Sequence, residues 1–153
     1  MMLRRRRRQG TILLEAAMVY PVLFMILLTI IVLGVGVFRY QQVAHAAREG
    51  ARYAAVHGAK YASETNSPAA TAQDVFDNAI KPQMGGTRGQ NITYTVTWNT
   101  SNTPTTTKTV TVGGVSKVVE KANTVSVTVT YAWNTHLFGT IPVSSTSVMV
   151  MCY

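Results

Sequence analysis

The first feature of the chain is a long stretch near the N-terminus in which apolar and polar residues do not alternate. Residues 16–38 read AAMVYPVLFMILLTIIVLGVGVF and contain no charged side chain. As an α-helix this stretch would be about 34 Å long, and the hydrocarbon core of a bilayer is about 30 Å thick. The pattern therefore predicts a transmembrane helix over residues 11–38.

The residues after the apolar stretch follow a helical pattern with small side chains on one face. Ala46, Gly50, Ala54 and Gly58 recur at every fourth position, and a second row of alanines lies beside them. Small side chains let another backbone approach a helix closely. We expect residues 39–65 to extend the transmembrane helix. The partner of its small-residue face is either the protein's own sheet or a neighbouring subunit.

The long helical pattern is expected to end near Ser63, and a short helix is expected to follow. Ser67 is a candidate N-cap, and Pro68 would then occupy the first helical position, where proline is favoured. This second helix is predicted to run to about Ile80 and to be stopped by Pro82 and the Gly85–Gly86 pair.

From about residue 91 onward, apolar and polar residues alternate, as they do in strands with one buried face. The apolar face of such a sheet needs cover, and the small-residue helix face can provide it. The predicted domain spans residues 66–153. Its three or four antiparallel strands are expected at about 92–98, 106–112, 124–133 and 143–151, with an exposed hairpin loop at 99–107.

The net charge of the chain is concentrated at one end. It is +8, from 14 basic and 6 acidic residues, and Arg4–Arg8 form one consecutive run. Residues 11–153 hold 9 basic and 6 acidic residues, a net charge of only +3, so no nucleic-acid partner is predicted. Cytoplasmic flanks of membrane spans are rich in Lys and Arg, so the leader, residues 1–10, is expected in the cytoplasm and the C-terminal domain outside it.

Between the arginines and the span lies a short segment with a glycine and a single carboxylate. A charge at the centre of a span costs about 2.5–3.5 kcal/mol and less near the interface, unless it is paired. Glu15 is therefore either solvated at headgroup depth or paired. A cut after Gly10 would leave an α-amino group on Thr11, and this amine on one helix could pair with Glu15 on a neighbour and set their register.

This arrangement resembles the prepilin signature of type IV pilins and pseudopilins. The shared features are a basic leader, a glycine, a glutamate five residues beyond it and a span that begins at once. The resemblance implies that a prepilin peptidase cuts between Gly10 and Thr11, and that Glu15 guides assembly.

Two further stretches resemble the TadE-like proteins of the tight-adherence (Flp-type) pilus system. One is LLEAAMVYPVLFMILL at residues 13–28, and the other is AAREGAR at residues 46–52. The resemblance is dense over residues 8–57 and looser in the C-terminal strands. The chain differs from the frequent Glu-Phe pair of that family in having Ala16 after its glutamate.

The sequence contains no arrangement of residues that indicates catalysis or metal binding. A single cysteine cannot form an internal disulfide, the histidines lack metal-ligand spacing, and the one close acidic pair is expected to face solvent. We expect no enzymatic activity, no cofactor and no metal. The residues considered are Cys152, His45, His57, His136, Asp74 and Asp77.

The predicted fold class is α+β. A long N-terminal transmembrane helix, similar to that of type IV pilins, continues into a small extracytoplasmic domain with a short helix and a three- or four-stranded antiparallel sheet. The predicted function is a minor pilin or pseudopilin of a tight-adherence pilus assembly and secretion system, acting in pilus biogenesis and adherence.

The expected location is the bacterial cytoplasmic (inner) membrane, crossed once, with the pilus or cell surface as a further location. The expected partners are a prepilin peptidase, other pilins and pseudopilins, the assembly platform and the lipid bilayer. Two alternatives remain open. One is an uncleaved, membrane-tethered adhesin or interaction domain, and the other is a secreted domain released after Ala46.

Overall fold

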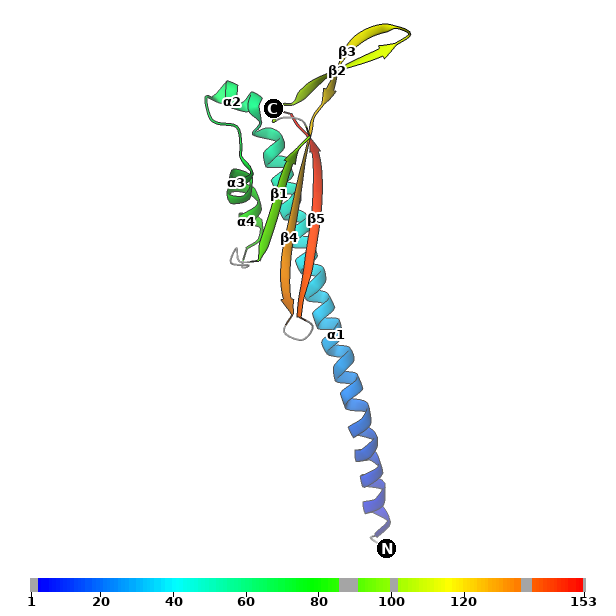
Figure 1. The fold of residues 1–153 in the computed structure, drawn as a ribbon. Coiled ribbons are helices and arrows are strands. Elements are labelled where there is room, and N and C mark those ends of the chain that lie inside the picture. The colour runs from blue at the N-terminus through cyan, green and yellow to red at the C-terminus, as the bar shows by residue number, and fades with distance from the viewer. Residues whose placement is uncertain (1–2, 86–90, 100–101, 136–138, 153) are drawn as a thin grey trace. The chain divides into compact units, whose positions relative to one another are not determined.

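The structure is a computed structural model that describes residues 3–85, 91–99, 102–135 and 139–152 of the chain. The chain divides into two compact units, Met1–Phe38 and Arg39–Tyr153. Helix α1 (Leu3–Val56) begins in the first unit and ends in the second (Figure 1). A long apolar helix is followed by short helices and antiparallel sheets, which confirms the expected α+β class.

The first unit is helical throughout its described residues, even though it contains a proline. Pro21 lies inside α1, where its ring removes one backbone hydrogen bond. The hydroxyl of Thr29 donates to the carbonyl oxygen of Met25, one turn earlier, at 2.7 Å. Because helical backbone groups are paired within their own segment, a helix of this kind can lie in an apolar medium.

In the second unit α1 ends earlier than the sequence pattern indicated. It stops at Val56, and a separate helix, α2 (Ala59–Thr65), follows. Between them Gly58 has an extended ψ of −168°. The amide of Ala59 donates to the carbonyl of Asn102 at 2.7 Å, so a distant loop also contacts the chain at the break.

The next helical segment starts at Thr71 and not at the predicted Ser67–Pro68. It consists of α3 (Ala72–Val75), a π-helical turn η1 (Phe76–Ile80) and α4 (Lys81–Gln83). The Thr71 hydroxyl accepts from the amide of Asp74, and the Asp74 carboxylate accepts from the amide of Thr71. This capping box fixes the start. Pro82 lies in the first turn of α4, where proline is tolerated, and the segment ends one residue later at Gln83, shortly before Gly85.

The main sheet has three antiparallel strands in the order β1–β4–β5. They are β1 (Ile92–Trp98), β4 (Thr124–Thr135) and β5 (Gly139–Val150). Val127 in the central strand lies opposite Val96 on one side and Ser147 on the other. Along β4 the valines are buried and the intervening Thr and Ser residues are half-buried, as the alternating pattern predicted.

The second sheet is a hairpin of two strands, β2 (Thr105–Val112) and β3 (Val115–Ala122). The sequence pattern missed β3, and the described residues form five strands in two sheets instead of the expected three or four in one. The stretch 99–107 is not a hairpin loop, because Thr105 already belongs to β2 and β1 pairs with β4. Residues 100 and 101 of that stretch lie outside the described residues.

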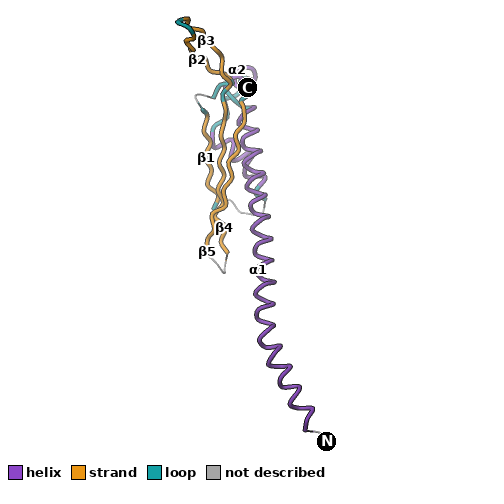
Figure 2. Tube along the Cα trace, turned by 90° about the vertical axis from the view of Figure 1, so that its right-hand side faces the viewer, coloured by secondary structure: helices purple, strands orange, loops and turns teal. Residues whose placement is uncertain are grey.

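The core of the second unit lies between α1 and the three-stranded sheet. Figures 1 and 2 show the strands running beside the second part of α1, with α3 and α4 next to β1. The buried valines of β4 face small side chains of α1, so helix and sheet pack closely. The core comprises Val43, Ala46, Ala47, Ala51, Ala54, Ala55, Ala70, Val75, Ile80, Met84, Val125, Val127, Val129 and Met151.

Candidate functional site

The residues of the expected processing site lie on the exposed N-terminal part of α1. Gly10, Thr11 and Glu15 are all exposed, and a Cβ at Gly10 would meet nothing within 4 Å. Glu15 follows Gly10 by five residues, which corresponds to a rise of about 7.5 Å along a helix. The two residues at the expected cleavage bond, Gly10 and Thr11, are therefore both on the surface of the described chain.

The apolar part of α1 exposes its large side chains almost without exception. Leu13, Met18, Met25 and Leu33 are 64–73% exposed, and the residues between them are similar. Among the described residues α1 is the one helix long and apolar enough to cross a membrane. Large apolar side chains on all sides of a helix are typical of a segment that lies in lipid.

The small-residue face in the second unit is buried within the domain. Ala46, Gly50, Ala54 and Gly58 are all buried. A Cβ at Gly50 would lie 3.0 Å from Cγ1 of Ile80 and 3.1 Å from Cγ1 of Val127. The protein's own η1 and β4 therefore occupy this face.

The charge that ends the apolar stretch is held by the sheet domain. The guanidinium carbon of Arg39 lies 5.8 Å from the ring centroid of Tyr131 in β4, and Nη1 donates to Oε1 of Gln42 at 2.9 Å. A cation–π contact of this kind is worth about 0.5–1 kcal/mol at an exposed site. Arg39 is thus the first charged residue of α1 after the apolar stretch, and it contacts the sheet.

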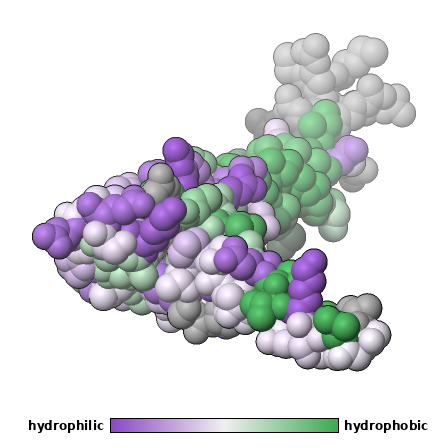
Figure 3. All heavy atoms as spheres, turned by 90° about the horizontal axis from the view of Figure 1, so that it is seen from above, coloured by the Kyte–Doolittle hydropathy of each residue, from purple (hydrophilic) through white to green (hydrophobic). Residues whose placement is uncertain are grey.

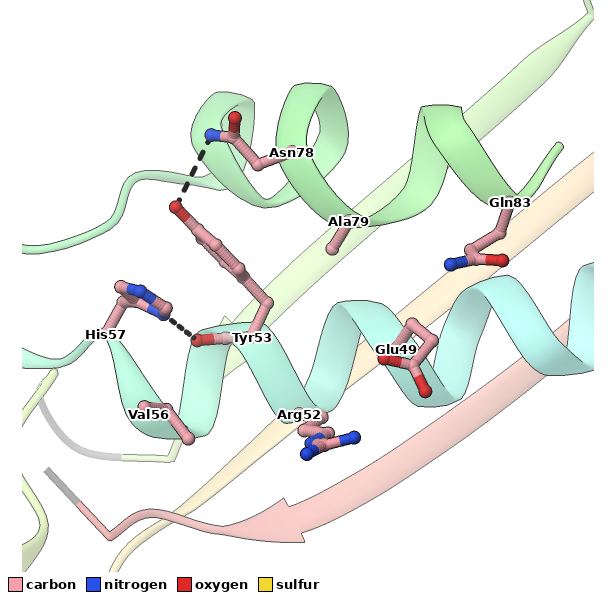
Figure 4. A pocket seen from close by; sticks show the side chains of 8 residues that line it. All are labelled: Glu49, Arg52, Tyr53, Val56, His57, Asn78, Ala79 and Gln83. Atoms are coloured by element: carbon pink, nitrogen blue, oxygen red, sulfur yellow. Dashed lines mark hydrogen bonds between the residues drawn. The ribbon is translucent and has the colours of Figure 1, made fainter. Parts of the chain in front are cut away.

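A shallow cavity of about 320 Å³ lies between α1 and the η1–α4 segment. The Tyr53 ring stacks on the His57 ring at 4.0 Å, and the Tyr53 hydroxyl accepts from Nδ2 of Asn78 at 3.4 Å (Figure 4). His57 also meets the Tyr61 ring edge-on at 4.7 Å. The cavity is lined by Glu49, Arg52, Tyr53, Val56, His57, Asn78, Ala79 and Gln83.

This aromatic row was missed by the sequence analysis, which considered His57 only as a candidate metal ligand. The spacing of Tyr53, His57 and Tyr61 at successive fourth positions was the signal that could have found it, because such residues share one helix face. In the structure Tyr53 links α1 to the η1 turn, and its polar contacts are made within the domain. The contacts of Tyr53 therefore stabilise the packing of α1 against the η1–α4 segment.

The close acidic pair has structural partners. The Asp74 carboxylate accepts from the hydroxyl of Thr71 at 2.7 Å and from its amide at 2.9 Å, and these bonds lower the pKa of Asp74 below its ordinary value. Asp77 lies 3.5 Å from Nζ of Lys81 and accepts from Gln73 at 2.8 Å. Both carboxylates are exposed, and they stabilise the short helices.

The described residues contain no group of three or more His, Cys, Asp or Glu side chains that could hold a metal ion. Cys152 is exposed with a free thiol, and His45 is exposed on α1. His136 lies outside the described residues.

The two units define the class of the protein: one apolar helix of membrane-spanning length that carries a small α+β domain. The family model described as TadE-like protein matches residues 10–52, that is, α1 from Gly10 to Arg52. The expected resemblance to TadE-like proteins is therefore confirmed over that segment. No protein with a curated description and no solved structure matches the chain.

Proposed function

We propose that this chain is a minor pilin or pseudopilin-like component of a tight-adherence pilus assembly and secretion system. The observation that carries the proposal is that the family match and the expected mature chain begin at nearly the same residue. The TadE-like match begins at Gly10, where the prepilin-type signature places its cut, and it covers the whole apolar segment of α1. The match to this pilus-associated family favours a role in pilus assembly over an enzymatic role.

In this proposal the basic leader keeps the N-terminus in the cytoplasm, and a prepilin peptidase of the inner membrane cuts between Gly10 and Thr11. The cut removes all five leader arginines and creates an α-amino group on Thr11. Glu15, one turn along α1, then pairs with the Thr11 amine of a neighbouring pilin or pseudopilin. In a medium of low dielectric such a pair is strong enough to set the axial register of two helices.

In this proposal the apolar part of α1, and not the small-residue face, packs against the helices of neighbouring subunits. The small-residue face of the second unit is filled by Ile80 and Val127 of the same chain, so it is closed to a second helix. Most large apolar side chains of residues 12–38 are exposed, and they can pack against other spans and the assembly platform as well as against lipid.

The processing step is tested by mass spectrometry of the chain extracted from membranes of cells that contain or lack the tight-adherence prepilin peptidase. We expect a mature chain that begins at Thr11 in cells with the peptidase and the intact chain in cells without it. Gly10→Leu should block the cut, and Gly34→Leu, placed in the span, should not. An intact N-terminus in cells with an active peptidase would favour the uncleaved, membrane-tethered adhesin instead.

The assembly step is tested with Glu15→Ala in the same cells. The variant should still insert into the membrane, and the number of pili per cell should fall. Wild-type piliation of this variant would show that the carboxylate has no role in assembly.

A further inference from the structure

Among the paired strands that the structure describes, the β2–β3 hairpin is the one pair that contributes no residue to the hydrophobic core. Its strands pair only with each other among the described strands, and every residue of β3 is exposed. An isolated two-stranded hairpin is marginally stable in water and leaves two open edges. The domain thus presents a ribbon whose two faces are both available to something outside the chain.

The register of the hairpin shows what each face carries. Residues opposite each other in an antiparallel pair lie on the same face, and the pairs alternate along the ribbon. One face carries four threonines with Ser116, Val118, Glu120 and Ala122 opposite them, and the Thr111 and Ser116 hydroxyls meet on it at 3.3 Å. The other face contains Thr106, Lys108, Val110, Val115, Lys117, Val119 and Lys121.

The lysine-bearing face has no carboxylate of its own. Lys108 lies opposite Val119, so its diagonal neighbours across the ribbon are Lys117 and Lys121, about 7–8 Å away. Glu120 lies on the opposite face, across from Thr107. The ion pairs found among the described residues involve Lys60 and Lys81 and none of the hairpin lysines. Three neighbouring cations repel one another unless an anionic partner approaches them.

The same face is also apolar. Val115, next to the turn, is 70% exposed, Val119 is 44% exposed and Val110 is 38% exposed. Gly113 and Gly114 form a tight two-residue turn with φ of 61° and 82°, so the ribbon has a narrow tip. In Figure 3 the hairpin, at the lower right, shows hydrophobic and hydrophilic patches side by side.

The combination of lysines and aliphatic side chains on one face indicates which kind of partner this face can bind. Single-stranded nucleic acids are bound by stacking on aromatic side chains and Arg, and residues 105–122 contain neither. A second copy of this chain is a poor partner, because residues 11–153 carry a net charge of +3. An anionic bilayer offers phosphates to lysines and a boundary region into which apolar side chains can enter.

We propose that the lysine-bearing face of the hairpin docks on a bilayer that contains anionic phospholipid. Lys108, Lys117 and Lys121 contact the headgroup phosphates, while Val110, Val115 and Val119 enter the boundary between headgroups and acyl chains. This contact is separate from the transmembrane anchoring by α1, and it gives the extracytoplasmic domain a membrane contact of its own.

The test uses the full chain in nanodiscs of neutral phosphatidylcholine, with Cys152→Ser and one new cysteine labelled with an environment-sensitive fluorophore. The cysteine is placed by Val115→Cys on the lysine-bearing face or by Ser116→Cys on the opposite face at the same height. On addition of vesicles containing phosphatidylglycerol, we expect the fluorescence of the Val115 label to rise and that of the Ser116 label to stay unchanged. Vesicles of phosphatidylcholine alone should change neither.

The charge dependence is tested with the triple variant Lys108→Gln, Lys117→Gln, Lys121→Gln. Each lysine near an anionic surface is worth about five-fold in affinity, so the triple variant should bind about a hundred-fold more weakly. The matched control is Arg48→Gln, Lys60→Gln, Lys81→Gln, which removes three charges elsewhere in the domain and should leave the Val115 signal unchanged. The leader arginines are present in every variant and cancel from the comparison.

Four results would overturn the proposal. They are an equal rise at both label positions, a rise that survives removal of the three lysines, an equal loss in the control variant, and binding of the anionic vesicles without any rise at Val115. The last result would mean that the lysines hold a polyanion at the surface and that the valines enter no lipid.

Discussion

The two halves of α1 show how one helix is adapted to two different surroundings. In the first unit its side chains are large and exposed on all sides, with Leu13 70% and Leu33 64% exposed. In the second unit its buried positions are small, and Ala46, Ala47, Ala51 and Ala54 are completely inaccessible. The backbone is helical in both halves, so the difference in side-chain size reflects what surrounds each half.

The physical reason is the distance at which each partner approaches. Lipid chains are as apolar as Leu and adapt to any side-chain shape, so the span needs only hydrophobicity. The sheet is rigid, and its buried valines must come close to the helix to leave no void. Gly50, with Ile80 and Val127 positioned just above it, is the point of closest approach.

The largest expected effect tests this difference with one substitution made in both halves. Gly50→Leu places a side chain where even a Cβ would lie 3.0 Å from Ile80 and 3.1 Å from Val127, and it should lower the free energy of unfolding of the second unit by about 3 kcal/mol or more. Gly34→Leu should leave that free energy unchanged, because a Cβ there meets nothing within 4 Å. Chemical denaturation of both full-length variants in detergent, followed by the β-sheet circular dichroism signal, measures the difference.

Equal stability of the two variants would contradict the close approach at Gly50. A destabilised Gly34→Leu variant would instead show that the span packs against part of the same chain.

A smaller effect is expected from trimming the side chain that covers Gly50. Ile80 is completely buried, and Ile80→Val should lower the free energy of unfolding by about 1 kcal/mol, since a buried methyl group is lost and a small cavity remains. Ile31, 61% exposed in the span, provides the same substitution in the other half. Ile31→Val should be neutral in the same denaturation experiment. A neutral Ile80→Val would mean that the η1 turn does not pack on α1.

The features that the sequence predicted are those in which one physical demand dominates. The long apolar helix was predictable because its sequence is an uninterrupted apolar run of sufficient length to cross a bilayer. The strand β4 was predictable because one of its faces is buried, so Val125, Val127 and Val129 alternate with polar residues. The small-residue row was visible for the same reason, but its partner was not, since either a sheet or a neighbouring helix could fill it.

The features that it missed depend on contacts between distant segments. β3 has no buried face and therefore no strong alternation, so its pattern resembles a polar linker. At the break after Val56 the amide of Ala59 is bonded to the carbonyl of Asn102, a contact that no local pattern encodes. The start of α3 was misplaced because Pro68 is a strong signal, whereas the capping box of Thr71 uses Asp74 in place of the commoner Glu or Gln.

The smallest expected effect concerns the capping box, which positions the segment that covers the buried half of α1. Asp74→Ala should destabilise the second unit by less than Ile80→Val does, because the carboxylate is exposed. Asp77→Ala is the matched control, since it removes a neighbouring carboxylate that is paired only with side chains of its own segment. The helicity of the span should be the same in both variants.

The contribution of Asp74 should also depend on pH in a defined direction. The hydroxyl and amide of Thr71 lower the pKa of Asp74 below its ordinary value of 3.8, so the folded state binds this proton less readily than the unfolded state. The stabilisation is therefore complete above pH 3.8 and is lost as the pH falls through the lower pKa of the folded protein. Thermal melts of wild type and Asp74→Ala over this range should converge toward acid. A gap between the melting temperatures that stays constant or widens there would show that the carboxylate is not the group that caps α3.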